Sequence, residues 1–183
     1  MISALSIALS SFRDKPHDAP FVGPAWYVAA AWLLGALLAQ ATLGHYLAVR
    51  SVVPSFVLVV VVWYAIRVDG RRAAVYGLAA GLCEDVLAPQ TGASWMIATG
   101  LSALLASRLS RGFFADSIPL AATITAIATL ARALLFWIVM AIGGYPQGLG
   151  TMHFHEALLA TALNVVTIVA AMVIARRFDV VTE

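Results

Sequence analysis

Charged residues are scarce in this chain. Only 11% of its 183 residues are Asp, Glu, Lys or Arg, whereas 62% are hydrophobic and the mean hydropathy is +0.94. Soluble domains carry about 25% charged residues, so this composition excludes a soluble domain and predicts an integral membrane protein. The net charge of +2 comes from arginines that lie between apolar stretches, so it does not indicate nucleic-acid binding.

Cysteine and catalytic motifs are also lacking. Cys83 is the only cysteine, which excludes an internal disulfide and a cysteine-based metal cluster. No serine or threonine stands in a nucleophile-elbow or Ser-Lys context, and there is no H-E-x-x-H motif. His153 and His155 precede Glu156 in what we expect to be an outer loop, but no further strong metal ligand lies nearby in the sequence. We therefore predict no enzymatic activity, no cofactor and no metal site.

Six apolar stretches predict a compact all-α bundle of six transmembrane helices. The second and third stretches have only about 15 residues, against the roughly 20 needed to cross a bilayer. A re-entrant hairpin would place its charged tip in hydrocarbon, so we expect two true crossings instead. The stretches cover residues 25–45, 52–66, 73–87, 93–107, 118–142 and 157–175.

Basic residues predict the orientation of the bundle. Nine of the eleven Lys and Arg residues fall in alternate gaps between the stretches and in the two tails. Cytoplasmic loops of membrane proteins carry an excess of Lys and Arg, so both termini are predicted to be cytoplasmic. The chain then divides into an amino-terminal tail (1–24), a transmembrane domain (25–177) and a carboxy-terminal tail (178–183). The amino-terminal tail is compatible with a short helix on the membrane surface and equally with a disordered segment.

Small residues recur at every fourth position in two of the stretches. Ala31, Gly35 and Ala39 form one row in the first stretch, and Gly77 and Gly81 belong to another in the third. Such rows let helix backbones approach closely in lipid. Packing within the bundle and docking of a partner's helix both account for them. We expect Gly81 to pack internally, because its hairpin is short and tightly connected.

A few polar residues lie within the stretches. The side chains of Glu84 and Asp85 project about 100° apart on a helix, so we expect one to face inward and the other to face the headgroups. Arg132 needs a partner at its depth, and we predict that Asp85 pairs with it or caps a helix within the bundle. Gln40 and Asn164 fall in the same outer half, so a cluster with Asp85 and Arg132 is geometrically possible. A ligand or proton role for Asp85 also stays open.

The second and third stretches carry a recognisable order of residues. A proline-initiated short helix ends in a Trp/Tyr pair, a basic turn follows, and G-x-x-x-G-x-x-x-D-x-L then leads to a glycine. Over about Arg50 to Arg111 this order resembles the MreD family of rod-shape-determining proteins. Glu84 departs from the family pattern, which has an apolar or small residue there. The residues that carry the resemblance are Arg50, Pro54, Ser55, Phe56, Trp63, Tyr64, Arg71, Gly77, Gly81, Asp85, Leu87 and Gly92.

The resemblance implies a non-enzymatic component of the bacterial cell-elongation machinery in the cytoplasmic membrane. It implies MreC as the partner, a single-span protein with a periplasmic coiled coil, and through MreC a connection to MreB filaments, RodA and a class B penicillin-binding protein. It also implies a distant likeness to the fold of substrate-binding subunits of energy-coupling-factor transporters. The alternative function is therefore a vitamin-binding subunit with a pocket lined by Asp85, Arg132 and Asn164.

Overall fold

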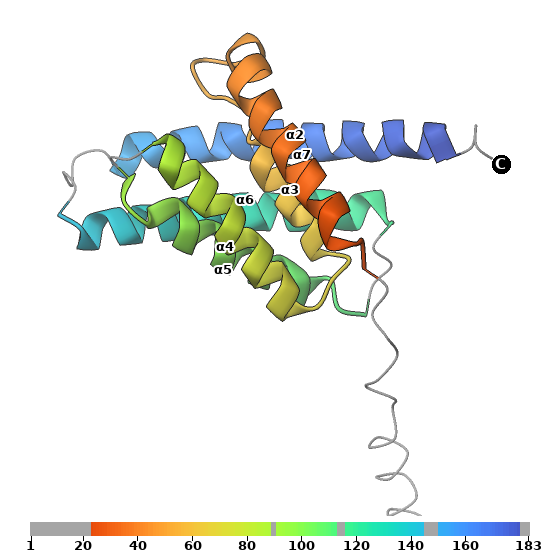
Figure 1. The fold of residues 1–183 in the computed structure, drawn as a ribbon. Coiled ribbons are helices and arrows are strands. Elements are labelled where there is room, and N and C mark those ends of the chain that lie inside the picture. Colours follow the sequence, from red (N-terminus) through yellow and green to blue (C-terminus); the bar gives the residue numbers. More distant parts are fainter. Residues whose placement is uncertain (1–22, 89–90, 113–115, 145–149, 180–183) are drawn as a thin grey trace, which may run out of the picture.

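The computed structural model describes residues 23–88, 91–112, 116–144 and 150–179. This part of the chain forms six α-helices and one short 3₁₀-helix, and it contains no strand (Figure 1). The amino-terminal tail, apart from residues 23–24, lies outside the described residues, as does the end of the carboxy-terminal tail. The helices are α2 (Trp26–Leu43), continued by η1 (Gly44–Leu47), α3 (Phe56–Ala65), α4 (Gly70–Leu87), α5 (Ser94–Leu109), α6 (Ile118–Ile142) and α7 (Gly150–Asp179).

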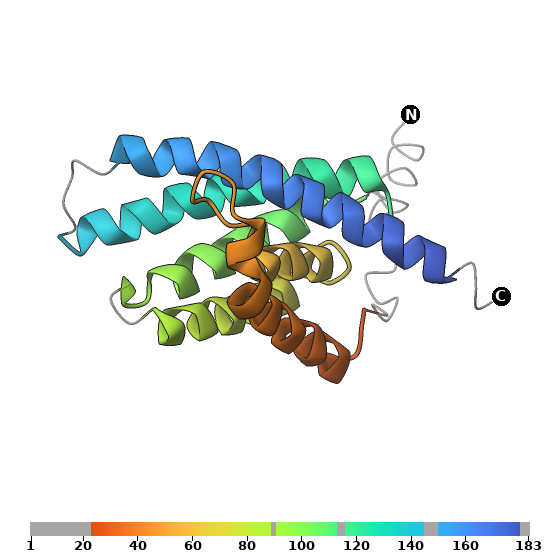
Figure 2. The same ribbon diagram turned by 90° about the horizontal axis from the view of Figure 1, so that it is seen from above.

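The helices surround α3. The long helices α6 and α7 run side by side, α4 and α5 form an antiparallel hairpin next to them, and α2 crosses on the outside (Figures 1 and 2). The short helix α3 contacts all five of the others. Most of its side chains are buried, which fits a segment that is apolar on every face. The core of the bundle is therefore the ten-residue helix α3 and the helix faces that enclose it.

Helices occur at all six predicted positions, but their bounds differ from the apolar stretches. Three segments are long and apolar enough to cross a membrane: Trp26–Leu47, Ile118–Ile142 and His153–Arg177. Helix α3 spans only about 15 Å along its axis, since each residue adds 1.5 Å. The all-helical fold is thus confirmed, while six full crossings with cytoplasmic termini stay a prediction.

The predicted loop around His153 was wrong. Helix α7 begins at Gly150, so His153, His155 and Glu156 are helical. Consecutive helical positions project about 100° apart, and residues two apart therefore point to nearly opposite sides. The two histidines consequently cannot share one ligand. Among the described residues, no group of three His, Cys, Asp or Glu side chains is placed to hold a metal ion.

The two rows of small residues face in opposite directions. A Cβ atom at Gly77 would lie 2.6 Å from Ala103 Cβ, and one at Gly81 would lie 2.6 Å from Met96 Cα, so α4 and α5 touch at these glycines. In contrast, a Cβ atom at Gly35 would have no neighbour within 4 Å. Ala31 is exposed and Ala39 is half-buried. The expectation that Gly81 packs internally is confirmed, and the row in α2 is turned away from the bundle.

An ion pair ties the ends of the helices together on the arginine-rich side. Arg67 Nη2 lies 2.8 Å from Asp116 Oδ1, and the guanidinium lies 4.4 Å from the centre of the Trp63 ring. Arg176 donates to the backbone carbonyl of Asp116. Burial lowers the pKa of Arg67, and the Asp116 carboxylate partly offsets this effect. Asp116 thus links the end of α3 with α7 just before α6 begins.

The glycine packing predicts opposite effects of one substitution at two sites. Gly81→Ala should lower the stability of the fold by about 1–3 kcal/mol or more, because the new methyl group meets the α5 backbone. Gly35→Ala should leave stability unchanged or raise it by up to about 1 kcal/mol, because alanine favours the helix. Thermal unfolding of the detergent-solubilised protein measures both. Equal losses for the two variants would contradict the assignment of the two faces.

Orientation can be tested with single cysteines in a Cys83→Ser background. Ala93 and Arg72 are both exposed and lie at opposite ends of α4 and α5. Positive-inside bias predicts that a cysteine at Ala93 reacts with an impermeant maleimide added to intact cells, and that one at Arg72 reacts only after lysis. Labelling at Arg72 in intact cells would overturn the predicted topology.

Candidate functional site: a buried polar network at the start of α3

Three helices meet at the amino terminus of α3. The first backbone N–H groups of a helix have no partner within the helix. Ser55 N donates to Asn164 Oδ1 of α7 at 2.7 Å, and Phe56 N donates to Gln40 Oε1 of α2 at 2.8 Å. The Ser55 hydroxyl accepts from Leu58 N at 3.2 Å as the helix cap. Side chains from two other helices therefore complete the hydrogen bonding of α3.

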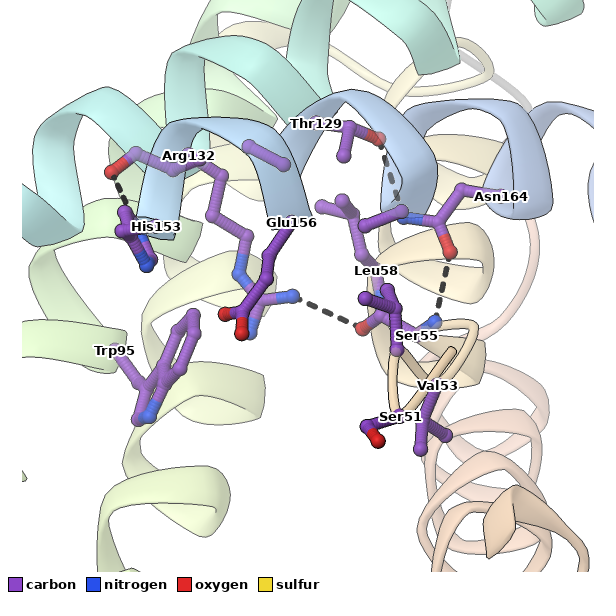
Figure 3. A pocket seen from close by; sticks show the side chains of 14 residues that line it. Ser51, Val53, Ser55, Leu58, Trp95, Thr129, Arg132, His153, Glu156 and Asn164 are labelled. Atoms are coloured by element: carbon purple, nitrogen blue, oxygen red, sulfur yellow. Dashed lines mark hydrogen bonds between the residues drawn. The ribbon is translucent and has the colours of Figure 1, made fainter. Parts of the chain in front are cut away.

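Arg132 of α6 extends this network to α4 and α5. Its Nη1 donates to Ser55 Oγ at 2.9 Å, and its Nη2 lies 2.5 Å from Glu84 Oε2. The guanidinium also stacks over the Trp95 ring, 4.3 Å from the ring centre. Asn164 Nδ2 donates to Thr129 Oγ1 at 3.2 Å, one helical turn before Arg132 (Figure 3). One arginine thus contacts three neighbouring helices.

Burial explains why Arg132 has so many partners. Its exposed fraction is 5%, and an unpaired charge at that depth costs several kcal/mol. Glu84 supplies the opposite charge, and Thr99 Oγ1 lies 3.4 Å from the same carboxylate oxygen. Arg132 Nε has no hydrogen-bond partner in the described part of the chain. The pair is therefore enclosed by protein, with Trp95 covering one face of the cation.

The predicted pairing of Arg132 with Asp85 was wrong. Asp85 accepts hydrogen bonds from Trp95 N at 3.1 Å, Met96 N at 2.8 Å and Thr91 Oγ1 at 2.8 Å. It therefore caps the amino terminus of α5, where backbone donors and the helix dipole favour a carboxylate. The alternative prediction, that Asp85 caps a helix within the bundle, is confirmed.

The expectation that one of the two carboxylates faces the headgroups was also wrong. Glu84 is half-buried and Asp85 is 5% exposed. They project in different directions, as adjacent helical residues must, but each direction leads to another helix. Because α4 packs against α5 through Gly77 and Gly81, its outer end is close enough for both carboxylates to find partners.

Three of the four residues in the predicted polar cluster come together. Gln40, Arg132 and Asn164 all reach the Ser55–Phe56 backbone or side chain, whereas Asp85 serves α5 instead. Ser55 was missed as the residue on which they converge. A serine between a proline and a long apolar run is a helix-start signal that points to it. Nothing in the sequence pattern singles out Trp95 or Thr129.

Other residues of the motif shape the turns beside the network. Arg50 and Ser51 have positive φ angles of 49° and 70°, in a tight turn closed by two hydrogen bonds between Val49 and Val52. Pro54 is buried just before α3. Gly92 has φ of +61° in the turn before α5, which suits a residue without a side chain.

A cavity of about 310 Å³ lies beside the network (Figure 3). Arg132, Asn164, Thr129 and Ser55 form its polar wall, while Ser51, His153 and Glu156 line it elsewhere. His153 Nε2 lies 3.2 Å from the Ala133 carbonyl oxygen. Asp85 is not among the lining residues, so only two of the three residues expected to line a vitamin pocket do so. The remaining lining residues are Val52, Val53, Leu58, Trp95, Ala133, Ala157 and Ala160.

The fold and this network define a helical membrane protein whose buried charges join its helices. The sequence pattern of the family described as rod shape-determining protein MreD matches residues 22–178, which cover all six helices except the last residue of α7. The chain belongs to the MreD family. A search of curated proteins and a search of solved structures gave no match.

The Glu84–Arg132 pair makes a testable contribution to stability. Glu84→Gln and Arg132→Gln should each lower the unfolding free energy by about 3–5 kcal/mol, because each strands one buried charge. The double substitution should cost less than the sum of the two. Thermal or denaturant unfolding in detergent gives the three values.

Asp85→Asn is the matched control, since it changes the adjacent carboxylate. Combined with Arg132→Gln, it should show a clearly smaller coupling energy than Glu84→Gln does. Strong coupling of Arg132 to Asp85 and weak coupling to Glu84 would contradict the observed pairing.

Proposed function

We propose that this protein is a non-enzymatic membrane component of the bacterial cell-elongation machinery that binds MreC. Through MreC it connects MreB filaments to RodA and a class B penicillin-binding protein. The observation that carries the proposal is the family match over residues 22–178, since the family is one of rod shape-determining proteins. The protein resides in the cytoplasmic membrane with both termini inside.

The buried polar groups support a scaffold more than a catalyst. Glu84, Asp85, Gln40 and Asn164 all hydrogen-bond to other groups of the same chain. A nucleophile or general base needs a lone pair directed at substrate. In this network the oxygen atoms are directed at helix termini and at Arg132. Their arrangement holds the bundle in one geometry, so that the protein acts through its surfaces.

Helix α2 offers the best surface for a partner helix. It packs mainly against α3 and leaves most of its circumference exposed. The small-residue row at Ala31 and Gly35 lies on the uncovered side, and no atom of the described chain comes within 4 Å of a Cβ position at Gly35. Small residues let a second backbone approach closely, which is how helices associate in lipid. We place the single membrane span of MreC on this face.

The transporter alternative lacks comparable support. Neither comparison with known proteins gave a match to a substrate-binding subunit. The four residues of the polar wall are committed to each other: Arg132 and Asn164 both bond to Ser55, and Asn164 also bonds to Thr129. A vitamin site needs convergent polar groups that are free to bind ligand.

Co-purification with tagged MreC tests the proposal. Gly35→Leu should abolish recovery of MreC while leaving the melting temperature of the isolated protein unchanged, because the leucine obstructs only the outer face. Ala30→Leu is the matched control, since Ala30 is also exposed and lies about 140° around α2 from Gly35. It should retain MreC.

Two results would count against this placement. Unchanged recovery of MreC with Gly35→Leu would move the partner to another face. Failure of the unsubstituted protein to recover MreC at all would contradict the proposed function itself.

A further inference from the structure

We propose that the arginine-rich end of the α4–α5 hairpin is a binding site for an anionic phospholipid. The site consists of Arg71 in the first turn of α4 and of Arg108 and Arg111 at the end of α5. Figure 1 shows that α4 begins beside the end of α5, so residues far apart in sequence meet there. The inference goes beyond the proposed function, because it concerns the lipid and not the protein partner.

Two of the guanidinium groups converge on one point. A Cβ atom at Gly70 would lie 3.3 Å from Arg108 Nε and 3.6 Å from Arg111 Nη2. Both guanidinium groups therefore lie beside the backbone at the start of α4, and an anion bound there would be attracted by both positive charges. Arg71 follows Gly70 directly, and Asp69, the residue before the helix, makes no capping hydrogen bond. The positive end of the helix dipole therefore adds to the charge of the arginines.

The described part of the chain supplies no carboxylate to these arginines. Two other arginines near this side of the bundle are used within the fold: Arg67 pairs with Asp116 at 2.8 Å, and Arg176 donates to the Asp116 carbonyl. The Asp69 carboxylate Oδ1 lies 3.7 Å from Arg72 Nε, so this carboxylate pairs with Arg72, and both side chains are exposed. In contrast, Arg71, Arg108 and Arg111 are exposed and form no ion pair with a described residue. A bound phosphate would compensate their charge, since one guanidinium group can donate two parallel hydrogen bonds to two phosphate oxygens.

The apolar surface beside the arginines favours a lipid over free phosphate. Val75, Leu78, Leu82 and Val86 are all exposed and follow Arg71 at helical spacing along one side of α4. Leu101 of α5 is also exposed and lies about two helical turns before Arg108. The cationic site thus stands at the end of an apolar track, which matches a phosphate headgroup followed by acyl chains. Arginines at a membrane surface attract anionic lipids in this way.

Native mass spectrometry of the purified full-length protein tests the site. The protein is released from micelles that contain phosphatidylglycerol and phosphatidylcholine in equal amounts, and the ratio of the two retained lipids is measured. The unsubstituted protein should retain mainly phosphatidylglycerol. R108Q/R111Q should reduce this preference by roughly 25-fold, about fivefold for each interfacial charge that is lost.

R50Q/R177Q is the matched control, because it removes two exposed arginines outside the cluster. This variant should still retain mainly phosphatidylglycerol. Arg71→Gln alone, which disturbs no described contact, should lower the preference about fivefold and serves if the double variant does not fold. An unchanged preference in R108Q/R111Q, or an equal loss in the control, would overturn the site.

Inorganic phosphate provides the last arm of the experiment. Because acyl chains are part of the proposed ligand, added phosphate should not displace phosphatidylglycerol. Displacement by phosphate alone would overturn the lipid assignment. The measurement uses the protein without MreC, so its failure is distinguishable from failure of the proposed function.

Discussion

The hydrogen bonds at the amino terminus of α3 are the constraint on which the bundle depends. Helix α3 is short and rich in valine, which has a lower helix propensity than leucine or alanine. The first N–H groups of α3 have no acceptor within the helix and lie partly buried in the bundle, where a missing partner costs free energy. Gln40 from α2 and Asn164 from α7 supply the acceptors. The hydrogen bonding of the core helix is therefore complete only when α2 and α7 stand in the observed positions.

Arg132 and Glu84 couple this constraint to the α4–α5 hairpin. The arginine reaches Ser55 with one nitrogen and Glu84 with another, so a displacement of α4 would strand a buried cation. Asp85, the next residue, caps α5 and fixes the hairpin from its other side. Adjacent carboxylates thus have separate roles, because the helix turns them toward different neighbours. Buried polar contacts thus join α3, α4, α5 and α6.

Three regions of the protein have different roles in these proposals. The buried network is directed inward and stabilises the fold. The exposed face of α2 carries small residues without a covering partner, which is the property that a docking helix requires. Arg71, at the start of α4, and Arg108 and Arg111, at the end of α5, form no ion pair with a described carboxylate, and there we propose an anionic lipid as the ligand. The proposed partner surface and the proposed lipid site therefore lie on different helices and can be tested separately.

The sequence by itself determined the class of protein, the approximate position of each helix and the resemblance to the family. Hydropathy and the residues that start and stop helices are local properties, and the G-x-x-x-G-x-x-x-D-x-L motif is read along one helix. The internal contact of Gly81 was also predicted from the sequence, because the short connection after the third stretch implies a tight hairpin.

Only the tertiary structure decided which side chains meet. In helices that are apolar on every side, the sequence carries no signal for rotation about the axis, so it gave no basis for choosing Glu84 over Asp85 as the partner of Arg132. The helix-start signal marks Ser55, but the same lack of periodicity gave no basis for predicting that Arg132 and Asn164 both contact it. The small-residue rows of α2 and α4 have the same spacing in the sequence, yet the row in α4 packs against α5 whereas Gly35 in α2 faces outward. That difference arises from the packing of whole helices, which no local pattern contains.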